Sequence, residues 1–145
     1  PLAARFGPLR SLPVTDPVQR RVAMMLASPG QYWMSIADHE MRYRNNERAR
    51  ALYEAALNDP QVLASQAQLG EIYQAMGWID LRLGDAASAV RHFDRSLQVG
   101  GQLPGAVCGL GLAELNRGRA AEADDLFQIS ARMGYPCSAG EEILR

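Results

Sequence analysis

The chain lacks lysine entirely, although 15 of its 145 residues are basic. All of this positive charge is on arginine, which indicates codon bias from a GC-rich, bacterial genome. An arginine-rich anion site is the functional alternative, but the arginines are scattered along the chain. The formal net charge of −1 excludes a chain-wide basic field of the kind that attracts nucleic acid or an anionic membrane.

Cysteine and histidine are equally scarce, with two of each. Cys108 and Cys137 are too few for a disulfide framework or a zinc site, and His39 and His92 match no metal-ligand spacing. We therefore expect no metal and no cofactor. The sequence leaves open whether the two cysteines pair, which an oxidising compartment would favour.

Long apolar runs are also missing. The longest uncharged run, residues 96–113, contains five glycines and one proline, which makes it a poor membrane span. No secretory signal peptide is visible. We therefore expect no direct membrane span.

What the sequence does contain is a repeat. The stretch "RLGDAASAVRHFDRSL" (82–97) returns 34 residues later as "NRGRAAEADDLFQISA" (116–131). A third, weaker copy, "RNNERARALYEAAL" (44–57), lies 40 residues upstream of its counterpart, with Tyr53 in the place of Phe93. The first junction therefore carries about six extra residues, and a fixed period of this length is typical of repeat architectures.

Each copy predicts two helices. In the last copy, Pro104 can begin a helix at its first turn and Gly118 ends it. A second helix is expected from about Ala120 to Met133, followed by the breakers Gly134 and Pro136. Small residues at matching positions allow the paired helices to approach closely, and the aromatic residues fill the space beside them.

This pattern resembles the tetratricopeptide repeat, whose motif is W-x2-L-G-x2-Y, then A-x3-F, then P. The matching residues are Trp33, Ile36, Ala37, Ala49, Tyr53, Ala56 and Pro60 in the first copy, Tyr73, Met76, Gly77, Ala89 and Phe93 in the second, and Leu110, Gly111, Ala123 and Phe127 in the third. The resemblance covers residues 30–137. It implies an all-α, right-handed α-solenoid of three helix pairs (about 30–60, 61–103 and 104–137) in a domain 16–145, with an N-terminal helix and a C-terminal capping helix.

The chain departs from the family motif at one position in every copy. The tyrosine of the first helix is replaced by Glu40, Asp80 and Glu114. Three acids at one position indicate either solvent exposure or pairing with arginines. The stretch "LGEIY" (69–73) offers a rival register for the second copy, but the register through Gly77 keeps the period of 34.

The flanking segments give further expectations. Asp59 and Pro60 can begin a helix of about 23 residues that would continue to Gly84. Asp16 and Pro17 can begin a leading helix, and "SAGEEILR" (138–145) has capping-box spacing for a short final helix. Residues 1–15 are expected to be extended. They are too apolar for a solvated tail, so we expect them to pack on the protein's own repeats or on a partner subunit. The alternative is a flexible linker from an upstream anchor, as in an envelope lipoprotein.

No stretch of the sequence carries a convincing catalytic site. The acid–histidine–acid run at 38–40 lies on one helix, where consecutive side chains point in different directions. The glycines of "GLG" (109–111) follow no strand, and helix packing explains them better than phosphate binding. We therefore expect that the protein is not an enzyme, with a stray enzyme as the remote alternative.

The family resemblance places the first helices of successive repeats on a concave face. By that register, twelve residues line a partly apolar, partner-binding groove: Met34, Asp38, Met41 and Arg42, then Gln74, Trp78, Leu81 and Arg82, then Cys108, Leu112, Leu115 and Asn116. The alternative is that several of them are interhelical core. The family's lysine-based carboxylate clamp is absent, since the chain has no lysine.

The function that we expect is that of a protein–protein interaction adaptor, which holds a segment of a partner protein or peptide. Size and repeat number are similar to those of bacterial accessory proteins that assemble pili, secretins or exopolysaccharide machines in the envelope. The alternative is a cytoplasmic chaperone similar to the class II chaperones of type III secretion. A periplasmic or outer-membrane location is favoured over the cytoplasm. A self-assembling structural module is an alternative of a different class, and self-association through the N-terminal segment is a further expectation. The sequence does not identify the partner.

Overall fold

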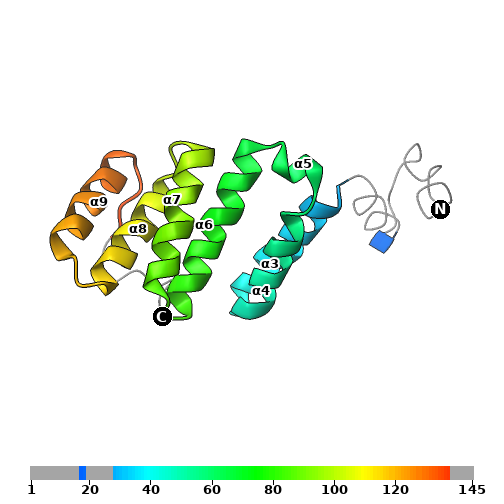
Figure 1. Cartoon of the computed structure of the whole chain (residues 1–145), viewed down its shortest axis with the longest axis horizontal. Helices are drawn as coiled ribbons and strands as arrows, with labels where there is room; N and C mark the ends of the chain where they lie inside the picture. Colours follow the sequence, from blue (N-terminus) through cyan, green and yellow to red (C-terminus); the bar gives the residue numbers. More distant parts are fainter. Residues whose placement is uncertain (1–16, 19–27, 138–145) are drawn as a thin grey trace.

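The computed structural model describes residues 17–18 and 28–137, which contain seven α-helices and no strand. The helices stand in a row, with α3 and α4 at one end and α9 at the other (Figure 1). This confirms the predicted all-helical fold. The helices are α3 (Pro29–Arg42), α4 (Asn46–Ala56), α5 (Pro60–Leu63), α6 (Gln66–Arg82), α7 (Ala86–Gly100), α8 (Pro104–Asn116) and α9 (Ala120–Arg132).

Three pairs of consecutive helices pack against each other, namely α3 with α4, α6 with α7, and α8 with α9. Neighbouring pairs meet through α4 and α6 on one side and through α8, which packs on both α6 and α7, on the other. The middle pair is therefore enclosed by the other two. Pro104 occupies the first turn of α8, and α9 covers the range expected from the sequence.

The turn inside each pair has the same geometry in all three copies. A residue with positive φ ends the first helix of each pair: Arg44 (61°), Gly84 (83°) and Gly118 (81°). The next backbone N–H donates to the carbonyl five residues earlier: Asn45 to Glu40 (2.9 Å), Asp85 to Asp80 (2.8 Å) and Arg119 to Glu114 (2.9 Å). This is the hydrogen bond of a Schellman helix end. The turns recur at the spacings of the sequence repeat, which supports the register through Gly77.

A close contact between a small residue and an aromatic ring also recurs. A Cβ atom on Gly77 would lie 2.7 Å from the ring of Phe93, and one on Gly111 would lie 2.6 Å from the ring of Phe127. In the first pair, the buried Ala37 and Tyr53 belong to one core cluster. The glycines are thus required where the ring of the second helix presses on the backbone of the first.

The prediction of one helix of about 23 residues after Asp59 is wrong, because the helix is interrupted at Ser65. Asp59 caps the four-residue α5, accepting a hydrogen bond from the N–H of Gln61 (3.0 Å). Ser65 is extended (φ −106°, ψ 107°), and its Oγ accepts from the N–H of Gln68 (3.2 Å). Ser65 and Gln68 have capping-box spacing, which is the sequence signal for this second helix start.

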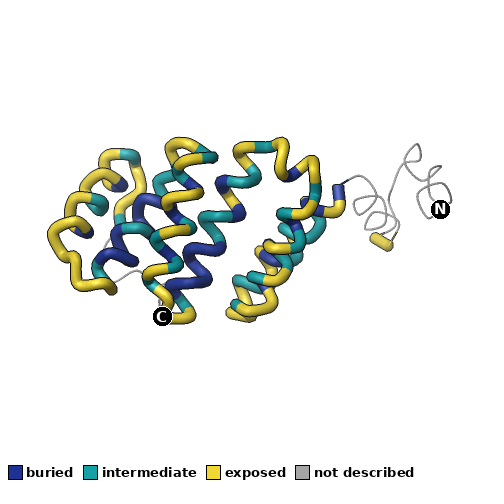
Figure 2. The backbone as a smooth tube through the Cα atoms, in the orientation of Figure 1, coloured by how far each residue is buried: buried dark blue, intermediate teal, exposed yellow. Residues whose placement is uncertain are grey.

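The core forms two clusters that follow the row of helices. The first joins α3, α4, α5 and α6 around Tyr53, Ile72 and Ile79. The second joins α6, α7 and α8 around Phe93 and Leu112. Figure 2 shows the buried residues concentrated along α6 and α8, in agreement with the residue exposures. These two helices consequently hold the pairs together.

The expectations for the chain ends lie largely outside the described residues. Pro17 and Val18 are helical, as expected for the start of a leading helix. The extended segment 1–15 and the final helix over 138–145 fall in ranges that the structure does not describe.

Candidate interaction surface

In the first pair, all four expected surface residues are at least partly accessible. Met34 and Met41 are half-buried, and Asp38 and Arg42 are exposed. The Asp38 carboxylate accepts a hydrogen bond from the hydroxyl of Tyr53. Burial, together with this hydrogen bond, raises the pKa of Tyr53, so its hydroxyl stays protonated and fixes the Asp38 side chain.

In the second pair, the expected residues divide between surface and core. Gln74 and Arg82 are half-buried, whereas Trp78 and Leu81 are only 6% and 5% exposed. The Trp78 ring meets the Phe93 ring edge to face, with centroids 5.2 Å apart and planes at 79°. Trp78 therefore packs within its own helix pair instead of presenting its ring to a partner.

In the third pair, Cys108 and Leu112 are buried, Leu115 is half-buried and Asn116 is exposed. Four of the twelve positions expected to line the groove are thus buried, in line with the alternative of interhelical core that the sequence left open. Trp78, Leu81, Cys108 and Leu112 all belong to the second core cluster. Two packed neighbours enclose the middle pair, and this explains why its first helix buries positions whose counterparts on α3 remain accessible.

Arg82 connects the first two pairs. Its Nη1 donates to the carbonyl of Met41 at 3.0 Å and lies 3.3 Å from Oδ1 of Asn46. Burial, and secondarily the guanidinium of Arg44, lowers the pKa of Arg82. Arg82 thus links the end of α6 to the end of α3 and the start of α4, and partner binding at this position would compete with that structural role.

The acid at the position where the tetratricopeptide motif has tyrosine is paired in every copy, as one of the two alternatives from the sequence predicted. Its partners are Arg48 (3.7 Å) and Asn45 (2.5 Å) for Glu40, Arg50 (2.9 Å) and His92 (2.5 Å) for Asp80, and Arg117 (2.9 Å) and Arg119 (3.4 Å) for Glu114. Only Asp80 links three helices, because Arg50 lies on α4 and His92 on α7. Asp80 is 2% exposed, and these two partners satisfy the polar atoms of its buried side chain.

Two further side chains pack next to the group formed by Asp80, Arg50 and His92. The His92 ring stacks on the Tyr73 ring with centroids 6.4 Å apart and an interplanar angle of 18°. The Arg95 guanidinium lies 5.9 Å from the centre of the Tyr73 ring. Sequence reasoning missed this group. Its one signal was the repeated acid, because the partners on α4 and α7 are brought together only by tertiary packing.

The two stretches that resemble catalytic motifs are explained by packing. Asp38 bonds Tyr53, the His39 ring contacts the Tyr43 ring at 4.8 Å, and Glu40 pairs with residues of the turn and α4. These three side chains therefore diverge. A Cβ atom on Gly109 would lie 2.2 Å from the Phe93 ring, which accounts for this glycine.

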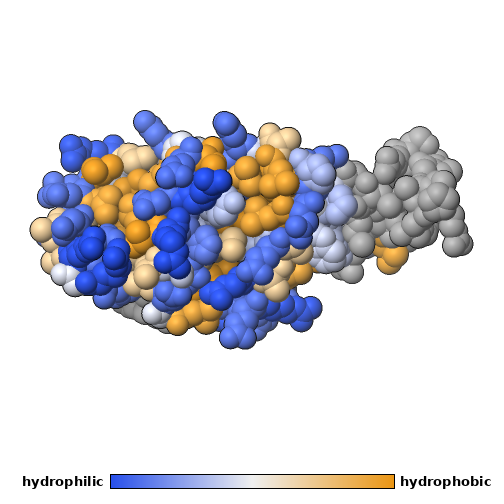
Figure 3. Space-filling model, in the orientation of Figure 1, coloured by the Kyte–Doolittle hydropathy of each residue, from blue (hydrophilic) through white to orange (hydrophobic). Residues whose placement is uncertain are grey.

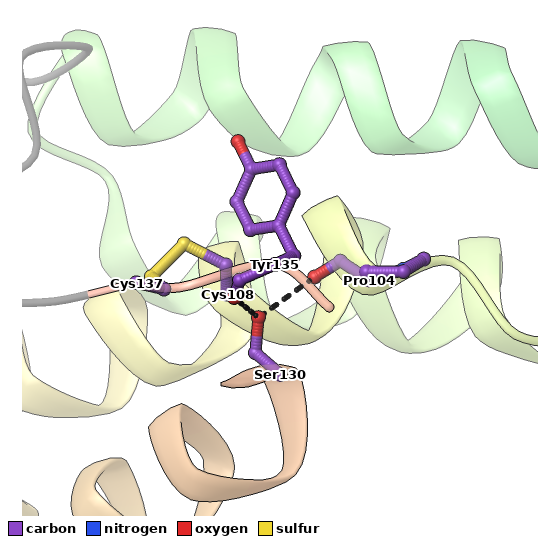
Figure 4. The surroundings of a disulfide bond; sticks show 5 residues. All are labelled: Pro104, Cys108, Ser130, Tyr135 and Cys137. Atoms are coloured by element: carbon purple, nitrogen blue, oxygen red, sulfur yellow. Dashed lines mark hydrogen bonds between the residues drawn. A yellow bond between two sulfur atoms is a disulfide. The ribbon is translucent and has the colours of Figure 1, made fainter. Parts of the chain in front are cut away.

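Cys108 and Cys137 form a disulfide, with their Cα atoms 5.7 Å apart, within the usual range (Figure 4). The bond attaches the chain beyond α9 to the buried face of α8. Nearby, the Ser130 hydroxyl donates to the carbonyl of Tyr135 (2.7 Å) and lies 3.4 Å from that of Pro104. The disulfide answers the question, left open by the sequence, of whether Cys108 and Cys137 pair.

No three metal-binding side chains come together in the ranges 17–18 and 28–137. Among the helices within these ranges, none has both the length and the apolar character needed to cross a membrane. Comparisons of the chain with protein-family models, with curated proteins and with solved structures each found no match.

Proposed function

We propose that this chain is a protein-binding adaptor whose three helix pairs form a right-handed α-solenoid of the tetratricopeptide type. The observation that carries this proposal is the recurrence of one pair design: the same positive-φ turn and the same small-residue–aromatic contact at the sequence period. Stacked helix pairs of one design are the architecture of repeat proteins, which use their extended surfaces for binding.

The partner-binding surface is proposed to lie on α3 and the accessible part of α6. Met34, Met41 and Gln74 offer partly exposed apolar and amide groups beside the charges of Asp38 and Arg42. Flexible methionines suit an irregular apolar ligand, and the charges can fix its register. Leu115 and Asn116 extend this surface to α8, whereas the four core residues named above do not contribute to it.

The disulfide favours an oxidising compartment, because structural disulfides are rare in proteins of the reducing cytoplasm. This supports a role in the bacterial envelope, such as assembly of pili, secretins or exopolysaccharide machines, over that of a cytoplasmic secretion chaperone.

Site-specific photo-cross-linking in the native organism tests the function. A photoreactive residue at the exposed Arg42 on α3 should capture one discrete protein, whereas the same residue at the exposed Glu54 on α4 should not. Equal capture at both positions, or no capture from Arg42, would contradict the adaptor proposal. Matched helicity of both labelled proteins controls for folding.

A further inference from the structure

A hollow of about 450 Å³ opens between α7, α8 and α9, away from the proposed partner-binding residues. Val90 from α7, Leu110 from α8 and Leu126 from α9 line it, and all three are half-buried. Apolar groups also gather among hydrophilic ones over this end of the molecule in Figure 3. A hollow of this size and lining can receive several apolar side chains.

The hollow carries excess negative charge. Four carboxylates line it against two guanidinium groups, and both guanidinium groups, of Arg117 and Arg119, are already paired with Glu114. The side chains of the other three acids, Asp94, Glu122 and Asp125, form no hydrogen bond or ion pair with any residue that the structure describes. Asp94 is exposed overall, but partial desolvation, and then the charge of Glu114, raises the pKa of its carboxyl group, and a cation beside this group would lower the pKa again.

One segment of this chain has the complementary chemistry. Residues 1–15, "PLAARFGPLRSLPVT", carry Arg5 and Arg10, no acid, and apolar residues between and around them. Three prolines restrict the segment and reduce the entropy that it loses on docking. An apolar stretch with two positive charges suits an apolar hollow that carries unpaired carboxylates.

The position of this segment in the chain favours a second copy as its source. The segment precedes α3, which stands at the opposite end of the row from α9 (Figure 1). To reach its own hollow it would have to pass several helices, each about 8–10 Å from the next. Only the twelve residues 16–27 lie between the segment and Ser28, so they alone would have to span that distance.

We propose that residues 1–15 of one copy dock into the hollow between α7 and α9 of a second copy, with the arginines beside the unpaired carboxylates. The contact joins different surfaces of the two copies, so it is head-to-tail and can continue into a ring or a filament. Like other electrostatically assisted contacts, it weakens as salt is added.

Sedimentation velocity of the full chain over a concentration series tests this proposal without any other protein. The wild type should self-associate, and a synthetic peptide of residues 1–15 should dissociate it. The double substitution Asp94→Arg/Asp125→Arg should weaken self-association at least about tenfold, because it opposes like charges. Asp124→Arg is the matched control, since Asp124 is exposed on α9 but does not line the hollow.

A charge exchange removes the ambiguity of a misfolded variant. Arg5→Glu/Arg10→Glu should also lose self-association, and mixing this variant with Asp94→Arg/Asp125→Arg should restore association between the two. A wild type that stays monomeric, an association unaffected by the hollow variant, or a monomer whose own segment is protected on its own hollow would each overturn the proposal.

Discussion

At the scale of single residues, Asp80 shows how a repeated position acquires an individual role. Glu40 and Glu114 pair with arginines in their own helix pair, but Asp80 pairs with Arg50 of the preceding pair and with His92. A buried carboxylate is tolerated only with such partners, and removing it leaves their charge or polarity partly unsatisfied. Asp80 on α6 therefore connects α4 and α7 through these two contacts.

Replacing Asp80 by alanine should lower the free energy of unfolding by about 2 kcal/mol, since Arg50 and His92 keep partial access to water. Urea unfolding followed by circular dichroism measures this. The comparison is Glu40→Ala, whose arginine partner is 73% exposed and 3.7 Å away, so its loss should cost less than about 1 kcal/mol. Equal costs for the two variants would refute the special role of Asp80.

Two aspartates should affect stability with opposite dependence on pH. Burial and Glu114 raise the pKa of Asp94, so ionising this group costs stability as the pH rises through that pKa. The side-chain and backbone hydrogen bonds from Ser88 lower the pKa of Asp85, the N-cap of α7, so its contribution is present at neutral pH and lost as the pH falls through that pKa.

Asp94→Asn should therefore raise the thermal midpoint at about pH 7, and Asp85→Asn should lower it. Both differences should shrink at about pH 3, where aspartates are largely protonated in the unfolded chain. Differential scanning calorimetry at the two pH values checks both signs. Shifts of the same sign at neutral pH would show that the electrostatic reasoning is wrong.

At the scale of elements, the three turns differ in how well their residues suit them. Gly84 and Gly118 adopt positive φ without strain, but Arg44 adopts 61° at the equivalent place. For a residue with a Cβ atom the left-handed conformation costs roughly 1 kcal/mol. Arg44 also adds positive charge near the half-buried Arg82.

Arg44→Gly should accordingly raise the free energy of unfolding, by up to about 1 kcal/mol. The control is Arg48→Gly within α4, where glycine should instead cost about 1 kcal/mol of helix stability. Chemical unfolding of both variants measures the two changes. If Arg44→Gly destabilised the protein, then contacts of the arginine side chain would have to outweigh the backbone strain.

Much at this scale could be predicted from sequence, because local rules decide it. Repeat spacing placed the paired helices, and Pro104 and Gly118 marked the bounds of α8. The break at Ser65 was missed because no glycine or proline marks it, although the Ser65–Gln68 capping spacing was present. Its effect is to end α5 after a single turn and begin α6 anew.

The candidate surface was less predictable, because accessibility depends on which helices become neighbours. Asp38 and Trp78 occupy the same register position, yet one is exposed and the other is enclosed against Phe93. Periodicity alone cannot distinguish them, since both lie on the same face of equivalent helices. The hollow between α7, α8 and α9 was missed for the same reason. It forms only where α7 and α9, the second helices of their pairs, lie on either side of α8.

At the scale of the whole molecule, the disulfide between Cys108 and Cys137 links the chain after α9 covalently to α8. The sequence separation of 29 residues corresponds to a stabilisation of about 3–4 kcal/mol if the bond acts mainly on the entropy of the unfolded chain. Reduction, or the substitution Cys137→Ser, should therefore lower the free energy of unfolding by a similar amount. Chemical unfolding with and without reductant checks this, and the variant should no longer respond to reductant. An unchanged midpoint on reduction of the wild type would contradict it.

The proposed partner-binding surface lies on α3, whereas α6 and α8 supply the core. Hydrogen–deuterium exchange of the chain, alone and saturated with the protein that cross-links through Arg42, tests it most directly. We expect the largest gain in protection in peptides that cover α3, with little change in the exposed turns around α9. Protection confined to α9, or no change at α3 on saturation, would show that the partner does not bind on α3.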